Sequence, residues 1–354
     1  MLLLVLLRRR KQQGRVGTRR RGATGLRRAA TPSSLPPMNT LPLRPLLCPW
    51  YRIAHGDGQV LLEHGTDCVV LEGRAASTFL PALLPLLDGT RTRGELAEQL
   101  ELTDPRPVDH ALSLLADHDL LVEGPPLAAD VPAPFAHAAN LQASILPGVT
   151  TPATERDRLC GTSIAVLGTG AVAGETARLL LASGVGELVR LDWTMGEPAR
   201  HDLVVAAPSR PELTRLPAWN ERALTEGTEW LQVLPWDGTV AVVGPAFVPG
   251  ETCCWECYRR RRRSHLEYGD ELAELEGVAP RSPLPPGLVA LVAGAAATLV
   301  LRRLVRDPLV AGAAAVLELG ESLRVGVHRV LRVPRCPACS ETARQALPSP
   351  WAEA

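Results

Sequence analysis

Residues 163–193 read SIAVLGTGAVAGETARLLLASGVGELVRLDW, and this stretch decides the fold of the larger part of the chain. An apolar run (163–167) precedes a glycine turn, a helix pattern (171–183) and a second strand pattern that ends at Asp192. The turn matches G-x-G-x-x-A, in which glycines permit a tight bend and bring a phosphate close to the helix N-terminus. This order predicts the first strand–helix–strand unit of a doubly wound, Rossmann-like α/β sheet.

The same stretch carries candidate nucleotide-binding residues. Asp192 lies 24 positions after Gly168, at a strand end where a carboxylate can bond a ribose hydroxyl. The candidates are Gly168, Gly170, Ala173 and Asp192. Such turns also persist in scaffolds that bind nothing, so the motif supports the fold better than it supports an occupied, functional nucleotide site.

Further elements continue the same α/β pattern toward the C-terminus. Strand patterns follow at 201–208, 239–247 and 313–319, and residues 324–333 lead into the last cysteines. The apolar run 288–301 stops at two arginines and is shorter than the ~20 residues that a membrane span needs. We therefore expect a buried helix over 288–304 and a soluble protein.

Two cysteine pairs form the most specific chemical signal. No secretory signal precedes the eight cysteines of the chain, which favours a cytoplasmic location and free thiols. Four of them stand in two C-x-x-C knuckles, Cys254–Cys257 and Cys336–Cys339. Four thiolates suit a closed tetrahedral zinc site, so we predict structural zinc with Cys253 as a bystander.

Charge divides the chain into a basic tail and an acidic body. Hydrophobic residues make up 46% of the 354 residues, which excludes a wholly disordered chain. Residues 1–37 hold ten basic residues and no acid, and we expect a disordered tail or a mis-called start there. The remaining 28 basic residues face 38 acidic ones, which disfavours nucleic acid as a partner.

A smaller domain precedes the α/β pattern. Short strands are predicted at 50–54, 59–64, 67–73 and 120–122, and helices at 75–87, 94–102 and 107–117, with Thr92 as an N-cap. This order predicts a winged-helix-like domain over 38–124. The predicted organisation continues with a Pro- and Ala-rich linker (125–159), the α/β domain with its zinc knuckles (160–340) and a tail (341–354).

The small domain is predicted to bind peptide rather than DNA. Between residues 38 and 124, six arginines stand against thirteen acids, the wrong balance for a phosphate backbone. An extended peptide can instead pair with an exposed strand edge beside apolar pockets. The candidate edge comprises Cys68, Val69, Val70 and Leu71, and the candidate pocket residues on the third helix are Val108, Leu112 and Leu115.

The stretch 163–193, followed by GPAFVPGETCCWEC and closing with PRCPAC, resembles the E1-like (ThiF/MoeB) activating-enzyme fold over residues 160–340. The whole layout resembles the ocin-ThiF-like, cyclodehydratase-type proteins of azole-modified ribosomal peptide (bacteriocin and thiopeptide) biosynthesis. That resemblance implies a peptide clamp that binds a precursor's leader and presents its core to a YcaO-type cyclodehydratase. Residues 46–124, with LLPLLDGTRTRGELAEQL, look like that clamp.

The departures from active E1-like enzymes concern catalysis. Those enzymes place an Asn-x-x-Arg segment soon after the ribose-binding acid and a lysine against the triphosphate. Here WTMGEPARHDLVV follows Asp192, and no lysine follows Lys11. Between Cys257 and Cys339 only Cys336, itself a ligand candidate, is available as a thiol nucleophile. The resemblance therefore implies a scaffold that lacks the catalytic apparatus.

We thus expect a leader-binding partner without catalytic residues of its own, since the chain ends fifteen residues after Cys339 without a YcaO domain. Structural zinc is the expected cofactor, ATP is disfavoured, and a membrane is not an expected partner, whereas homodimerisation stays open. One alternative is an active ATP-dependent adenylating enzyme, and another is an NAD-dependent oxidoreductase. The arginine run 259–263 fits either a solvated helix face or a docking patch.

Overall fold

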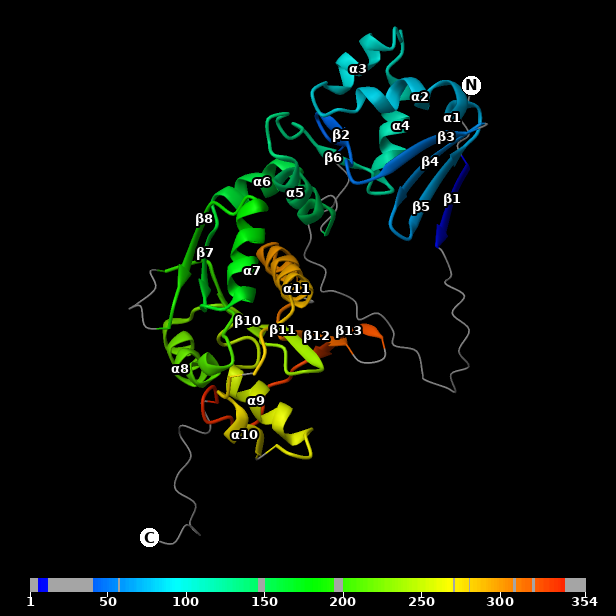
Figure 1. The fold of residues 1–354 in the computed structure, drawn as a ribbon. Coiled ribbons are helices and arrows are strands. Elements are labelled where there is room, and N and C mark those ends of the chain that lie inside the picture. Colours follow the sequence, from blue (N-terminus) through cyan, green and yellow to red (C-terminus); the bar gives the residue numbers. More distant parts are fainter. Residues whose placement is uncertain are drawn as a thin grey trace, which may run out of the picture. The chain divides into compact units, whose positions relative to one another are not determined.

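The computed structural model describes residues 6–11 and 41–340, apart from 57, 146–149, 194–199, 270, 280, 308–309 and 320–321. The chain divides into two compact units, each with its own hydrophobic core (Figure 1). The first unit comprises Met1–Val131 with Leu146–Glu155, and the second comprises Pro132–Ile145 with Arg156–Ala354.

The first unit contains a four-stranded antiparallel sheet. Across the sheet the strands are β1 (Leu6–Lys11), β5 (Asp67–Glu72), β4 (Gln59–His64) and β3 (Arg52–Gly56). Three of these strands lie where the sequence predicts them. The predicted closing strand is β6 (Leu121–Glu123), which leaves this sheet and pairs with β2 (Pro45–Leu47).

Helices cover one face of this sheet and complete the core of the first unit. The predicted helix 75–87 is broken into α1 (Arg74–Thr78), α2 (Leu80–Leu83) and the 3₁₀ turn η1 (Leu84–Leu86), since Pro81 and Pro85 cannot donate helical hydrogen bonds. The next helices are α3 (Arg93–Gln99) and α4 (Arg106–Ala116). Thr92 caps α3 as predicted, in a reciprocal capping box with Glu95.

The segment expected as a linker, 125–159, contains two helices. They are α5 (Ala133–Ile145) and α6 (Pro152–Cys160). Ala139 and Ala143 on α5 are completely buried, and the amide of Gln142 donates a 2.8 Å hydrogen bond to the carbonyl of Leu301. The alanines that suggested a connector by composition instead allow α5 to pack closely within the second unit.

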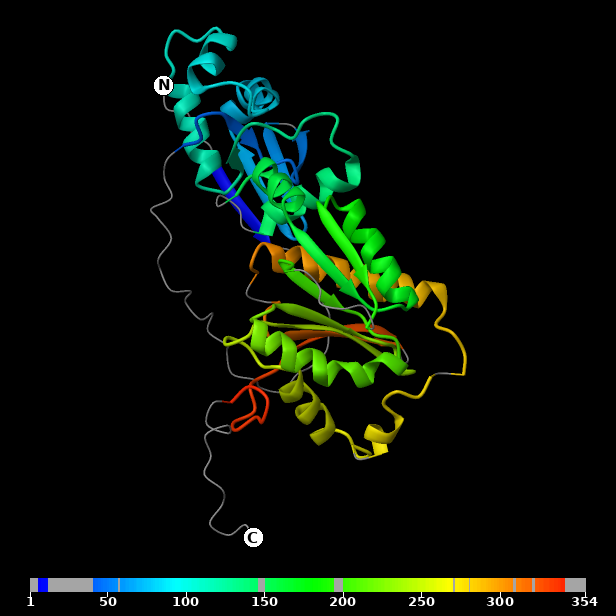
Figure 2. The ribbon, with the colours of Figure 1, turned by 90° about the vertical axis from the view of Figure 1, so that its left-hand side faces the viewer.

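The second unit is built on a seven-stranded sheet. Across the sheet the strands are β13 (Leu323–Arg329), β12 (Ala313–Leu319), β11 (Val240–Phe247), β10 (Trp230–Leu234), β9 (Leu203–Ala206), β7 (Ser163–Leu167) and β8 (Glu187–Leu191). Figure 2 shows helices on both faces. One face carries α7 (Ala171–Ala182) and α11 (Pro286–Leu304), and the other carries α8 (Leu216–Glu226) and α9 (Trp255–Ser264).

Only part of this sheet is parallel. Strands β8, β7, β9 and β10 run parallel, whereas β11, β12 and β13 alternate in direction. The predicted Rossmann-like sheet is therefore mixed, with a parallel part and an antiparallel extension. Only 235–239 separate β10 from β11, and a connection this short joins antiparallel neighbours, since a parallel crossover needs a dozen residues or more.

The apolar helix α11 belongs to the core of the second unit. By length and composition it is the one helix among the described residues that passes for a membrane span. Its side chains Val292, Ala296 and Val300 are nonetheless buried, in the same cluster as residues of β7, β11 and α7. This packing agrees with the predicted buried helix.

Two glycine-to-alanine substitutions should have opposite effects on the stability of this unit. At Gly168 φ is +143°, and an added Cβ would lie 2.2 Å from the carbonyl oxygen of Ala207. Gly168→Ala should therefore lower the free energy of unfolding by ~2 kcal/mol or more. Gly294 lies within α11 with open space around its Cα, so Gly294→Ala should raise it by up to ~1 kcal/mol. Urea titrations of both variants would contradict this if the shifts had the same sign.

Candidate functional site

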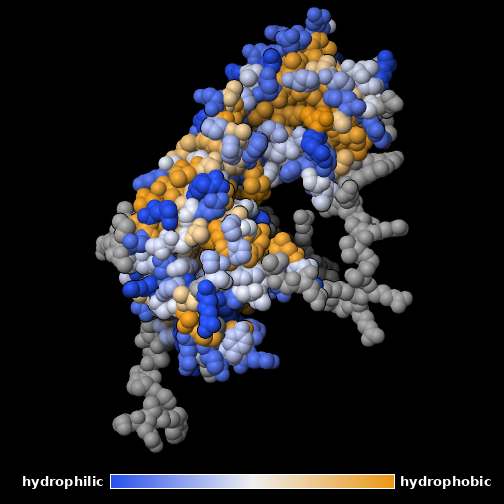
Figure 3. Space-filling model, viewed as in Figure 1, coloured by the Kyte–Doolittle hydropathy of each residue, from blue (hydrophilic) through white to orange (hydrophobic). Residues whose placement is uncertain are grey.

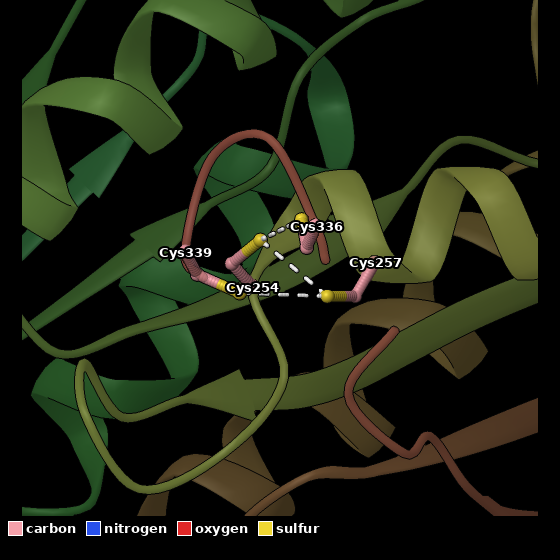
Figure 4. Close-up of side chains that lie close together, drawn as sticks. All are labelled: Cys254, Cys257, Cys336 and Cys339. Carbon is pink, nitrogen blue, oxygen red and sulfur yellow. Dashed lines mark hydrogen bonds between the residues drawn. The ribbon is translucent and has the colours of Figure 1, made fainter. Parts of the chain in front are cut away.

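The four knuckle cysteines converge on one point in the second unit. Figure 4 shows Cys254 and Cys257 at the start of α9, facing Cys336 and Cys339 from the loop that follows β13. Their four sulfur atoms all lie within 4.8 Å of one another, and three of the residues are buried. The spacing of the two knuckles predicted this grouping, although the pairs are 82 positions apart in the chain.

The distances between the sulfurs suit a tetrahedral metal site. Neighbouring Sγ atoms are 3.8 Å apart for Cys254–Cys257, 3.7 Å for Cys254–Cys336 and 3.6 Å for Cys257–Cys339. Zinc–sulfur bonds of about 2.3 Å at tetrahedral angles imply sulfur–sulfur distances of about 3.8 Å. A disulfide would need about 2.05 Å, and all four cysteines are free. The donor set therefore fits zinc, and four ligands leave no open position for a substrate.

Local hydrogen bonds position the two knuckles. Cys254 is the N-cap residue of α9 and has an extended backbone. The N–H of the next residue, Trp255, donates a 2.9 Å hydrogen bond to the buried side-chain oxygen of Asn220 on α8. The guanidinium of Arg261 donates to the carbonyls of Leu331 and Arg332, which lead into the second knuckle. The first contact joins α9 to α8, and the Arg261 contacts link the two knuckle segments independently of any ion.

The thiols influence one another strongly. The hydrogen bond from Cys254 lowers the pKa of Cys257 to about 4 against the effect of burial, and the N–H of Val333 also donates to this sulfur. The same bond and burial raise the pKa of Cys254. Burial raises the pKa of Cys253 to about 12, and this thiol lies outside the sulfur cluster. The structure thus separates the two adjacent cysteines as the spacing predicted.

Every arginine in the run 259–263 has a partner within the second unit. Arg259 and Arg260 share the carboxylate of Glu256. Arg262 faces Asp237, and Arg263 donates to the carbonyl of Gly269. With Arg261 bonded to two carbonyls, the pattern favours a structural role over a docking patch.

The predicted nucleotide residues come together at one end of the sheet. Strands β7 and β8 are parallel neighbours in register, so Gly168 and Asp192 follow directly after the paired residues Leu167 and Leu191. Gly170 is the N-cap of α7, and Ala173 is fully buried against the sheet. The scaffold of a nucleotide turn is therefore present.

A carboxylate already occupies the hydrogen-bonding groups beside this turn. Glu212 lies in the 3₁₀ turn η2 (Pro211–Arg215) after β9. Its carboxylate accepts a hydrogen bond from the hydroxyl of Thr169 at 2.7 Å, and two more from the N–H and the hydroxyl of Ser209. Burial alone would raise the pKa of Glu212, but hydrogen bonds from Ser209 and Thr169 lower it, so the side chain is ionised at neutral pH. A fixed negative charge here disfavours a phosphate.

The predicted peptide edge lies on β5. Val69, Val70 and Leu71 are buried, and Cys68 is half-buried. On one side β5 pairs with β4. We call its other side, the backbone groups of Asp67–Glu72 that point away from β4, the β5 edge.

The predicted pocket residues on α4 do not face a surface. Val108, Leu112 and Leu115 are all 0% exposed and pack in the core of the first unit. Spacings of three and four residues define one helix face, but a core and a ligand pocket produce the same pattern. The expectation that these side chains contact a peptide is corrected. Around α2 and α4, Figure 3 nevertheless shows hydrophobic surface on the face in view.

Two features escaped the sequence analysis. The strand β1 lies within residues 1–37, for which the sequence predicts a disordered tail or a mis-called start. The contact between Glu212 and the glycine turn is the second. The S-x-x-E pattern of Ser209 and Glu212 predicts the hydrogen bond between these two residues, but not the one to Thr169.

Comparison with solved structures relates both units to known proteins. A heterocyclase in complex with substrate and cofactor aligns with a TM-score of 0.65 and 21% identity, over 84% of this chain and 39% of its own. The heterocyclase TruD aligns with a TM-score of 0.64 and 23% identity, over 86% of this chain and 44% of its own. MccB of E. coli, solved with AMPCPP and MccA, aligns with a TM-score of 0.62 and 14% identity, over 83% of this chain and 99% of its own. The chain shares their fold.

The resemblance inferred from the sequence is thereby confirmed at the level of the fold. The chain spans about two fifths of the length of the heterocyclases and matches nearly the whole of MccB. No protein-family model and no curated protein matches the sequence.

The adjacent cysteines provide a matched test of the metal centre. The purified chain should contain about one zinc per molecule, Cys254→Ser should lose most of it, and Cys253→Ser should retain it, because only Cys254 lies in the sulfur cluster. Elemental analysis and thermal unfolding with a chelator measure both effects. Equal zinc content in the two variants would contradict the assignment.

Proposed function

We propose that this chain binds the leader of a ribosomally made precursor peptide and presents it to a separate YcaO-type cyclodehydratase for azoline formation. In this proposal the first unit is a winged-helix-like clamp, and the second unit is a pseudo-E1 scaffold without catalysis of its own. The leader pairs with the β5 edge as an added strand.

One observation carries this proposal: the β5 edge accepts an extended segment. Six consecutive residues, Leu6–Lys11, pair with β5 in antiparallel register from Leu6–Glu72 to Lys11–Asp67. Backbone pairing of this kind gives affinity to any extended peptide, while neighbouring side chains give specificity.

The second unit supports a role without catalysis. Glu212 supplies a negative charge beside the glycine turn, where an adenylating enzyme must hold a triphosphate. The described residues 41–340 contain no lysine to offset that charge. The sulfur cluster is a closed set of four ligands, so zinc bound there would brace the fold rather than activate water.

The proposed mechanism is an increase in local concentration. A leader held on the first unit keeps the attached core peptide near the active site of a bound cyclodehydratase. Tethering of this kind raises effective concentrations to the order of millimolar without any new contact to the reacting residues. The activation of Cys, Ser or Thr side chains with ATP is assigned to the partner.

Leader binding is tested with a labelled leader peptide from a precursor encoded beside this chain. Fluorescence anisotropy should show saturable binding to the full chain. Val70→Pro should weaken it at least tenfold, because proline disrupts the β5 backbone. The matched substitution Val325→Pro, on the edge strand β13 of the other unit, should leave the affinity unchanged. No binding of any labelled leader would contradict the proposal.

The active adenylating enzyme is the second candidate, favoured by the match over nearly the whole length of MccB, which has been solved with AMPCPP and with ATP. It is separated from the first candidate by pyrophosphate exchange. We expect no exchange above background with Mg·ATP and precursor peptide, and no change on Glu212→Gln. Exchange by the wild-type chain that depends on Asp192 would favour the adenylating enzyme instead.

A further inference from the structure

The β5 edge is occupied by the chain's own residues. Strand β1 runs antiparallel to β5 and covers all six of its residues, from Asp67 to Glu72. Within this sheet β5 is therefore an inner strand, between β1 and β4. Any other peptide can pair with this edge only after β1 has left it.

The charges of the two partners are complementary. The sequence of β1 is LLRRRK, with four cations in six residues. Residues 38–124 of the same unit contain thirteen acids against six arginines. At the end of the ladder the backbone register pairs Lys11 with Asp67.

We propose that residues 6–11 form a built-in competitor strand, which closes the β5 edge until an incoming leader displaces it. This inference rests on the proposed function of that edge and adds a regulatory step to it. The segment also serves as a template for the ligand class: an extended peptide with an apolar start and a basic end, antiparallel to β5.

Because residues 6–11 belong to the same chain as β5, even weak pairing between them is enough to close the β5 edge. A segment attached to the same chain competes at an effective concentration on the order of millimolar. If the free segment bound the edge with a Kd of about 100 µM, tethering would weaken the binding of an incoming peptide about tenfold. A leader therefore needs a lower Kd, or a higher concentration, to reach the same occupancy, and weakly binding peptides stay largely unbound.

Two consecutive prolines in β1 open the edge without shortening the chain. Alternate residues of a strand donate their N–H groups to the same neighbour, so Arg8→Pro with Arg9→Pro removes at least one donor that faces β5. The matched control, Arg8→Gln with Arg9→Gln, removes the same two charges and keeps every backbone donor. The pair of variants separates strand pairing from simple attraction of a basic tail.

The first probe is a labelled synthetic peptide with the sequence of residues 4–13, LVLLRRRKQQ. It should bind the proline variant about tenfold more tightly than the wild-type chain or the glutamine control. Hydrogen exchange at the amides of β5 should also be faster in the proline variant than in either of the others. Equal peptide affinity and equal exchange in wild type and proline variant, or equal release by glutamine and proline, would overturn the inference.

Precursor leader used as a second probe separates this inference from the proposed function. Tighter leader binding by the proline variant than by wild type supports both. Equal leader binding by the two overturns the competitor strand and leaves leader binding intact. If the LVLLRRRKQQ peptide binds the proline variant and leader binds neither protein, the edge is closed by β1 but is not a leader site.

Discussion

The second unit depends on the junction of two segments that are far apart in sequence, the start of α9 and the loop after β13. The four sulfurs draw these segments together, and Arg261 secures them through two backbone carbonyls. Four thiols gathered this closely in the interior have few other partners, and binding of zinc would turn their desolvation into a net stabilisation. A closed set of four thiolates would leave no open position on a bound metal for a substrate.

The residues of the glycine turn are constrained by backbone packing as well as by any nucleotide. Gly168 has to remain glycine because the backbone of Ala207 approaches it closely, whether or not a nucleotide binds. Ala173 likewise stays small for packing between helix and sheet. The motif therefore reports on geometry, and only the groups that face the turn report on activity. Here those groups include the carboxylate of Glu212, which disfavours a phosphate.

Sequence patterns predicted the elements whose structure depends on local residue spacing. They did not predict the features that depend on which other element a strand or helix packs against. The run 163–193 and the two knuckles fix their structures through short-range geometry, and both were located to within a residue or two. Strand direction in β11 to β13 escaped because an apolar strand looks the same in parallel and antiparallel pairs. On α4, the spacing of Val108, Leu112 and Leu115 defined a buried face but could not distinguish core from pocket. Strand β1 was missed because LLRRRK has no periodicity of its own and becomes a strand only against β5.

An open strand edge creates a conflict between recognition and solubility. The backbone groups that would capture a leader also pair with any other exposed strand, which invites aggregation when no leader is present. A tethered basic strand resolves this conflict, because its charges suit the acidic unit and its own affinity need only be modest. Closure lowers the affinity of the edge for every peptide by the same factor. The side chains around the edge raise the affinity only for some peptides. Closure by β1 therefore leaves the ratio of affinities between peptides unchanged, but it lowers the occupancy of the edge by weakly binding peptides while protecting the edge.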